Sequence, residues 1–217
     1  FGNARWDLDR DQFNAAVATV KAVREAVGPD VDLCIEVHGR LSVHSSIRMG
    51  WALEEFKPFF YEEPVPEDNV DAMVKVGNSI RIPIATGERR YTVHGFRELL
   101  EKNVAQIIQP DICHDGGILQ TRKIAAMAEA YYVQVQPHNA NGPLGTAVSL
   151  QIDACIPNFI IQEFFFTDLP LYAEVLTVPI ELEKGYLKIP TGPGLGTDLN
   201  EEGMARHPYQ PRDRSMY

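Results

Sequence analysis

The chain alternates short apolar runs with longer segments in which apolar residues recur every three or four positions. The clearest helical segment begins after Asp9, a good N-cap residue, carries Phe13, Val17 and Val20 on one side, and stops at Gly28. The same spacing predicts further helices over residues 43–56, 69–78, 92–101 and 143–154, and one that opens at Gly116-Gly117.

Apolar runs of strand length lie between these helices, over residues 31–38, 59–62, 82–88, 104–109, 132–136 and 159–163. Strands that alternate with helices predict βα units around a parallel sheet. An acid or a histidine closes each run, and these residues recur at intervals of 23 to 27 residues. Right-handed crossovers place all these strand ends on one face, which is the active-site face of a (β/α)8 barrel.

The predicted fold is therefore α/β, a (β/α)8-type barrel of which this chain holds about the last six units. Six units cannot close an eight-stranded barrel, so we expect the first strands to lie before Phe1. After Pro170 the pattern fades into a hairpin over residues 178–187 and an irregular tail. We predict a partial, catalytic barrel over residues 1–170 and a C-terminal extension over residues 171–217.

Composition narrows the classes of partner. The 217 residues are 45% hydrophobic, enough for one sizeable core. A net charge of −10 without a basic cluster argues against nucleic-acid binding, and no run is long and apolar enough to cross a bilayer. Cys34 and Cys155 lie in apolar sequence surroundings and are predicted to be core residues of a protein in a reducing, cytoplasmic compartment.

Three strand-end glutamates form a candidate metal site. Glu36, Glu62 and Glu88 close three consecutive runs and are spaced 26 positions apart in each step. Carboxylates gathered in this way repel one another unless a cation joins them, and oxygen ligands suit Mg²⁺ better than zinc. One such glutamate alone would be read as a solvated loop residue. Glu63 alternates to the other side of its run and is predicted to lie behind the ligands.

Candidate acid–base residues close the neighbouring runs. His138 and Asp111 end adjacent predicted strands, and an aspartate beside a histidine fixes its tautomer and supports a general base. A lone histidine after proline would more often be structural. His38 follows Glu36 by two residues and is a candidate general acid. Glu163 ends the last run, where it could stabilise a developing negative charge.

Other polar residues carry weaker signals. Arg40 and Arg89 lie near the expected mouth of the barrel. The sequence is equally consistent with two interpretations: contact with an anionic substrate, or simple exposure to solvent. The remaining histidines lack such partners in the pattern and are predicted to lie on the surface or in loops: His44, His94, His114 and His207.

Seven motifs carry a family resemblance: Ile35-Glu36-Val37-His38-Gly39-Arg40, Tyr61-Glu62-Glu63-Pro64-Val65, Ala85-Thr86-Gly87-Glu88-Arg89, Gln109-Pro110-Asp111, His114-Asp115-Gly116-Gly117-Ile118, Pro137-His138 and Gln162-Glu163. Together they resemble the mandelate racemase subgroup of the enolase superfamily, and most of all its galactonate dehydratase-like sugar-acid dehydratases. The first ligand here is Glu36, where the galactonate enzymes have aspartate.

The resemblance implies a role for each strand-end residue. It implies a Mg²⁺ site made by Glu36, Glu62 and Glu88, a base made by His138 with Asp111, an enolate stabiliser at Glu163 and an acid at His38. It also implies a homo-oligomer and a capping domain, outside this chain, on which the C-terminal extension packs. A histidine or lysine base beside Mg²⁺ is the established chemistry of enolase-superfamily sites.

The function implied is dehydration of an acid sugar, an aldonate of the galactonate type, to a 2-keto-3-deoxy acid. A racemase or epimerase of a 2-hydroxy acid is the first alternative, because it shares the metal and His138 but needs a second base on the opposite face. A non-catalytic, sugar-acid-binding relative is the second alternative. His38 favours dehydration, since it supplies an acid for the departing hydroxyl.

Overall fold

The computed structural model describes residues 5–209, and within them the chain forms two compact units. The first unit runs to His138 and includes residues 156–161, and the second comprises residues 139–155 and the chain from Gln162 onward. The division predicted near residue 170 stays a prediction.

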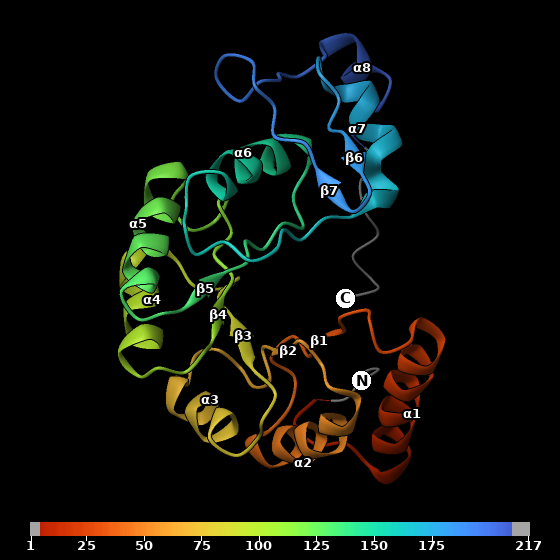
Figure 1. Ribbon diagram of the computed structural model, residues 1–217, viewed down its shortest axis with the longest axis vertical. Coiled ribbons are helices and arrows are strands. Elements are labelled where there is room, and N and C mark those ends of the chain that lie inside the picture. Colours follow the sequence, from red (N-terminus) through yellow and green to blue (C-terminus); the bar gives the residue numbers. More distant parts are fainter. Residues whose placement is uncertain (1–4, 210–217) are drawn as a thin grey trace. The chain divides into compact units, whose positions relative to one another are not determined.

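The first unit is built on a parallel sheet of five strands whose order follows the chain, as in a βα barrel (Figure 1). Glu36 at the end of the first strand is in register with Glu62 at the end of the second, and Glu62 is in register with Ala85. The strands are β1 (Cys34–Glu36), β2 (Phe60–Glu62), β3 (Ile84–Thr86), β4 (Ile107–Ile108) and β5 (Gln134–Val135).

Helices connect the strands and lie on the outer side of this sheet (Figure 1). Asp9 caps the first of them, accepting a hydrogen bond from the Gln12 amide, as its sequence predicts. Phe60, Ala85 and Ile107, on three neighbouring strands, form a buried apolar cluster against which Phe59 and Ile160 pack. The helices are α1 (Arg10–Val27), α2 (Val43–Leu53) with a 3-10 turn η1 (Glu54–Phe56), α3 (Val70–Gly77), α4 (Thr92–Glu101) and α5 (Ile118–Glu129).

The sixth predicted strand, residues 159–163, is wrong beyond its first residue. Phe159 makes one isolated parallel bridge to Val135, and the Ile160 amide donates to the Val135 carbonyl. The ladder cannot continue on the β5 side, because Pro137 has no amide hydrogen to donate. The partial-barrel fold is confirmed with five regular strands and this single bridge.

The second unit is smaller, and most of its regular elements are helices. Its core contains Leu150, Tyr172, Leu176 and Ile180. The hairpin predicted over residues 178–187 is present as two short antiparallel strands, whereas two of its helices have no counterpart in the sequence prediction. Its elements are α6 (Pro143–Asp153), η2 (Phe166–Asp168), α7 (Leu169–Val175), β6 (Leu182–Glu183), β7 (Tyr186–Leu187) and α8 (Glu201–Ala205).

The prediction that Cys34 and Cys155 are core residues is wrong. Cys34 and Cys155 are both exposed free thiols, as is Cys113. Cys34 lies on β1, which pairs with β2 on one side only among the described strands, so its strand is not enclosed on both sides. Across residues 5–209, every helix is too short or too polar to cross a membrane.

Candidate active site

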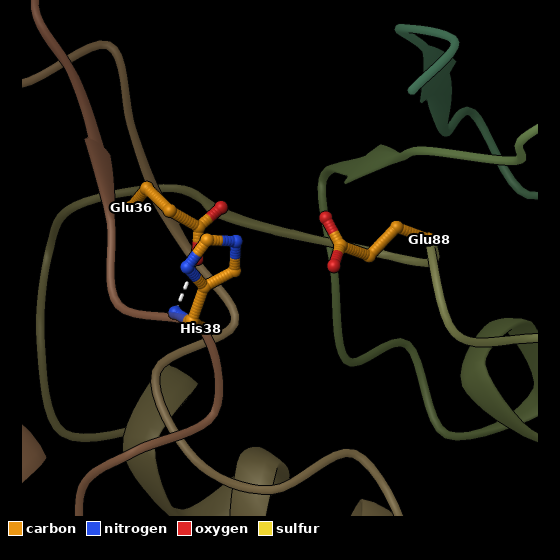
Figure 2. Close-up of side chains that lie close together, drawn as sticks. All are labelled: Glu36, His38 and Glu88. Atoms are coloured by element: carbon orange, nitrogen blue, oxygen red, sulfur yellow. Dashed lines mark hydrogen bonds between the residues drawn. The ribbon is translucent and has the colours of Figure 1, made fainter. Parts of the chain in front are cut away.

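Glu36, His38 and Glu88 bring their side chains together beyond the ends of β1 and β3. One potential ligand atom from each lies within 4.8 Å of the others. Figure 2 shows the Glu88 carboxylate pointing toward Glu36 and His38, which stand side by side. Two carboxylates and an imidazole form a donor set suited to a divalent cation, with the carboxylates favouring Mg²⁺.

A left-handed turn places His38 in this group. His38 has a φ of 55° and Gly39 a φ of 60°, so the chain reverses directly after β1. The His38 amide then donates a hydrogen bond to the Glu36 carboxylate (Figure 2). A positive φ is unusual for histidine and costs energy, which the surrounding contacts must offset.

Glu62 does not belong to this converging group, although its backbone lies in register with Glu36. Its place at the end of β2, between β1 and β3, keeps it beside the two other glutamates along the sheet edge. Its role as a ligand stays a prediction, as do the roles of Glu36 and Glu88.

Glu63 contacts Arg89, which in turn contacts Glu88 of the converging group. Its side chain is fully buried and forms an ion pair with Arg89, whose Nη2 is also 3.1 Å from Glu88 Oε1. Burial, and next the charge of Glu88, raise the pKa of Glu63 to about 8, while Arg89 acts in the opposite direction. Arg89 therefore links the buried acid to Glu88 and restrains the Glu88 carboxylate.

His138 lies between two carboxylates. Its Nδ1 is 2.7 Å from Asp111 Oδ2 and its Nε2 is 3.3 Å from Glu88 Oε2. Asp111 is fully buried and its other oxygen accepts a hydrogen bond from the Cys113 amide, so it is held in place. The pairing of His138 with Asp111 is as predicted, and the contact with Glu88 joins this pair to Glu36, His38 and Glu88, the candidate metal group.

His114 is exposed in a turn, as predicted, but the expectation that it lacks an acidic partner is wrong, as it is for His207, which lies 3.1 Å from Glu174. The Nδ1 atom of His114 lies 3.6 Å from the same Asp111 oxygen that contacts His138. The turn at residues 111–115 brings the ring back, because the His114 amide bonds to the Asp111 carbonyl. The contact depends on this turn, which strand and helix periodicity does not reveal.

Glu163 belongs to the second unit, where Asn139 holds it through two hydrogen bonds. Its Oε2 accepts a 2.7 Å hydrogen bond from the Asn139 amide, and its carbonyl accepts a 3.1 Å bond from Asn139 Nδ2. The Asn139 side chain also donates to Thr146 Oγ1. The predicted role of Glu163 as a stabiliser of negative charge stays a prediction.

A cavity of about 510 Å³ opens beside His38 in the first unit. Its lining includes Arg40 and Arg89, which the sequence pattern places near the mouth, and also Arg5 and Trp6. The sequence pattern could not find the last two, since they precede the first predicted helix and end no strand.

Comparison with known proteins places these features in a family. Residues 1–203 match the family model described as enolase C-terminal domain-like. The chain belongs to this family. The resemblance seen in the strand-end motifs is thereby confirmed.

Relatives in the enolase C-terminal domain-like family extend well beyond the region matched here. The chain is 32% identical over 98% of its length to a D-gluconate dehydratase of Thermoproteus tenax, covering 43% of that protein. It is 36% identical over 92% of its length to a D-xylonate dehydratase of Haloferax volcanii (48% covered) and to a D-galactonate dehydratase of Variovorax paradoxus (54% covered). The chain thus spans about half the length of these relatives.

Solved structures of the family have the same fold. A mandelate racemase/muconate lactonizing enzyme from Jannaschia superposes with a TM-score of 0.90 at 32% identity, covering 98% of this chain and 54% of the other. A member of the enolase superfamily from Salmonella Typhimurium gives a TM-score of 0.90 at 37% identity, covering 95% and 53%.

Proposed function

We propose that the protein is a Mg²⁺-dependent dehydratase of an acid sugar. The proposal rests on the two contacts of the His138 ring. One ring nitrogen contacts buried Asp111, and the other contacts Glu88 of the candidate metal group. Relatives named as dehydratases of gluconate, xylonate and galactonate support the substrate class.

The residues present fit a magnesium ion. Glu36, Glu62 and Glu88 would hold it, since all three are carboxylates at neighbouring strand ends. When bound, Mg²⁺ supplies positive charge that stabilises the enolate of a substrate carboxylate and makes the adjacent C–H bond more acidic. Arg89 holds Glu88 in place and so orients one of the ligands.

His138 would remove the proton on the carbon next to the substrate carboxylate. Asp111 accepts the hydrogen bond of Nδ1–H, so Nε2 is the nitrogen that takes the proton. The same carboxylate stabilises the imidazolium that results. The pair thus acts as an oriented base, with the buried aspartate fixing the ring.

His38 would donate the proton that the leaving hydroxyl needs. The bond between the β carbon and its hydroxyl breaks as the α-carbanion electrons form the C=C bond, and the hydroxyl leaves as water. The enol product then becomes a 2-keto-3-deoxy acid. His38 stands beside Glu36 and within the group that includes Glu88, close to where the reacting carbons would lie.

The convergence of His38 with two glutamates also admits it as a metal ligand. His38→Gln in the full-length protein separates the two roles. If His38 is the general acid, the His38→Gln variant keeps its Mg²⁺ affinity within about twofold of the parent, and its turnover falls by at least about a hundredfold. A loss of Mg²⁺ affinity of tenfold or more would instead make His38 a ligand.

The function itself is tested by a library of acid sugars incubated with full-length protein and Mg²⁺. Semicarbazide reacts with the keto acid that dehydration forms, and addition of EDTA provides the control. We expect keto-acid product from at least one sugar acid, and none after EDTA. A hydroxy acid that changes configuration without keto product would show a racemase, and no turnover of any acid would contradict the proposal.

A further inference from the structure

The cavity beside His38 is cationic in a protein of net charge −10. Its charged lining residues Arg5, Arg40 and Arg89 all carry positive side chains, and no acid of the described chain lines it. Trp6 forms another part of the wall. Arginine guanidinium groups that share a cavity favour an anionic ligand, which they bind through paired N–H donors.

One wall of the cavity is fixed by hydrogen bonds. The Trp6 amide donates to the Arg40 carbonyl at 2.7 Å, and the Ser42 amide donates to the Trp6 carbonyl at 2.6 Å. The hydroxyls of Ser42 and Ser45 both donate to Asp7 Oδ1, at 2.7 and 2.8 Å, and lower the pKa of Asp7. The segment that carries Arg5 and Trp6 is therefore tied to the turn after β1.

The segment after β2 contributes Pro66 to the lining. The Gly39 amide donates to the Glu63 carbonyl at 2.8 Å, and a Cβ atom at Gly39 would lie 3.2 Å from Pro66 Cα. Glu63 and Glu88 already pair with Arg89, so much of its charge is used within the protein. Arg5, by contrast, has no ion pair among residues 5–209, and its charge is available to a ligand.

We propose that this cavity binds a second anionic group at the far end of the substrate, and that the preferred substrate is a sugar dicarboxylic acid. This inference rests on the proposed function. His38 belongs both to the metal group and to the cavity lining, so a carbon chain that reacts beside His38 extends into the cavity. Arg5 and Arg40 determine specificity by binding the distal carboxylate, and Trp6 covers the C–H faces of the chain.

The experiment measures ligand binding rather than turnover. Trp51 is replaced by phenylalanine, which leaves Trp6 as the sole tryptophan of these 217 residues, and any tryptophan outside them is replaced in the same way. The full-length W51F protein with Mg²⁺ is titrated with glucarate, gluconate and 6-phosphogluconate, which differ only in the group at the far end. We expect Trp6 emission to change on binding, and glucarate to bind at least tenfold more tightly than gluconate.

Arg5→Gln and Arg40→Gln test the two arginines in the same background. We expect each to reduce the preference for glucarate over gluconate to less than threefold, while gluconate affinity and thermal stability stay close to those of the parent. Arg97→Gln is the matched control. It removes the same charge from the exposed face of α4, where Arg97 pairs with Glu101, and we expect it to leave the preference intact.

Three results would overturn the inference: equal binding of gluconate and glucarate, a preference that survives both arginine substitutions, or tighter binding of 6-phosphogluconate, which would assign a phosphate to the site. Failure of the proposed function gives a different pattern. If glucarate binds as expected but no acid is dehydrated, the subsite stands and the dehydratase does not. If gluconate is dehydrated but glucarate binds no more tightly, only the subsite fails.

Discussion

Two adjacent glutamates at the end of β2 have different environments. Glu62 lies at the strand end in register with Glu36, whereas Glu63 is fully buried against Arg89. Glu62 is the last residue of β2, whereas Glu63 follows the strand with a φ of 40°, and its carboxylate contacts Arg89. The two residues should therefore respond differently to substitution.

Glu62→Gln should lower Mg²⁺ affinity by about tenfold or more, because an amide oxygen replaces a charged ligand. Isothermal titration of full-length protein with Mg²⁺ measures the change. Glu67→Gln is the control, since Glu67 is also acidic and lies near Arg89 at 4.0 Å but ends no strand. An unchanged titration for Glu62→Gln would remove Glu62 from the ligand set.

Asp153 gives a pH-dependent prediction outside the site. It ends α6, and both its carboxylate oxygens are buried without a hydrogen-bond partner among the described residues. Burial raises the pKa of Asp153 from 3.8 to about 8. The unfolded chain loses this proton near pH 4, so the contribution to folding is fully present below that pH and is lost as pH rises toward 8.

Asp153→Asn should remove this loss, because asparagine stays neutral. Urea unfolding should show the variant about 2 kcal/mol more stable than the parent at pH 8 and nearly equal at pH 4. Asp68→Asn, at an exposed position, should leave the pH dependence of the parent unchanged. A variant that loses stability at pH 8 would show that the Asp153 charge is stabilising.

For single residues, the sequence predicts contacts between side chains at the ends of neighbouring strands. It misses contacts that are set by the conformation of turns and loops. The approach of His138 to Asp111 follows from two neighbouring parallel strands, and it is observed. The contact of His114 with Asp111 and the place of Arg5 in the cavity follow from loops, whose geometry has no periodic signature.

At the scale of elements, the turn between β3 and α4 controls how Glu88 is presented. Gly87 has a φ of 145°, a conformation that is essentially confined to glycine. A Cβ atom there would lie 2.8 Å from the Gln109 backbone nitrogen and 2.8 Å from the Phe96 ring. Backbone and ring must approach this closely for Glu88 to stay beside His138.

Gly87→Ala should destabilise the protein by at least about 1–3 kcal/mol and weaken Mg²⁺ binding, since both strain and a clash with backbone act together. Gly95→Ala is the matched control, because Gly95 lies inside α4 and a Cβ atom there would be 3.6 Å from its nearest neighbour. That change should stabilise by about 0.5–1 kcal/mol. Equal effects of the two substitutions in thermal unfolding would contradict this account of the turn.

The elements are predicted best where local signals are strong. The Asp9 cap and the apolar spacing define α1, and Pro143 begins α6 as expected. The predicted strand over residues 159–163 reduces to one bridge because Pro137 removes a donor on the neighbouring strand, a pairing effect that a single segment does not reveal.

At the scale of the whole molecule, the family and the partial-barrel fold are established, whereas activity concerns the full-length protein. Structural relatives superpose along nearly all of this chain, which covers little more than half of theirs. Within the first unit, parallel strands bring Glu36, Glu88 and His138 to one edge of the sheet. The proposed function depends on His138 acting at this edge as a general base beside a bound Mg²⁺ ion.

The most direct test is His138→Asn in the full-length protein, assayed with Mg²⁺ and its best sugar acid. Asparagine cannot accept the α-proton, and a general base contributes about 10²–10⁴-fold to rate. We predict that keto-acid formation falls by at least about a hundredfold while Mg²⁺ affinity stays within about twofold of the parent. Dehydration at the parental rate would contradict the assignment of His138 as the base.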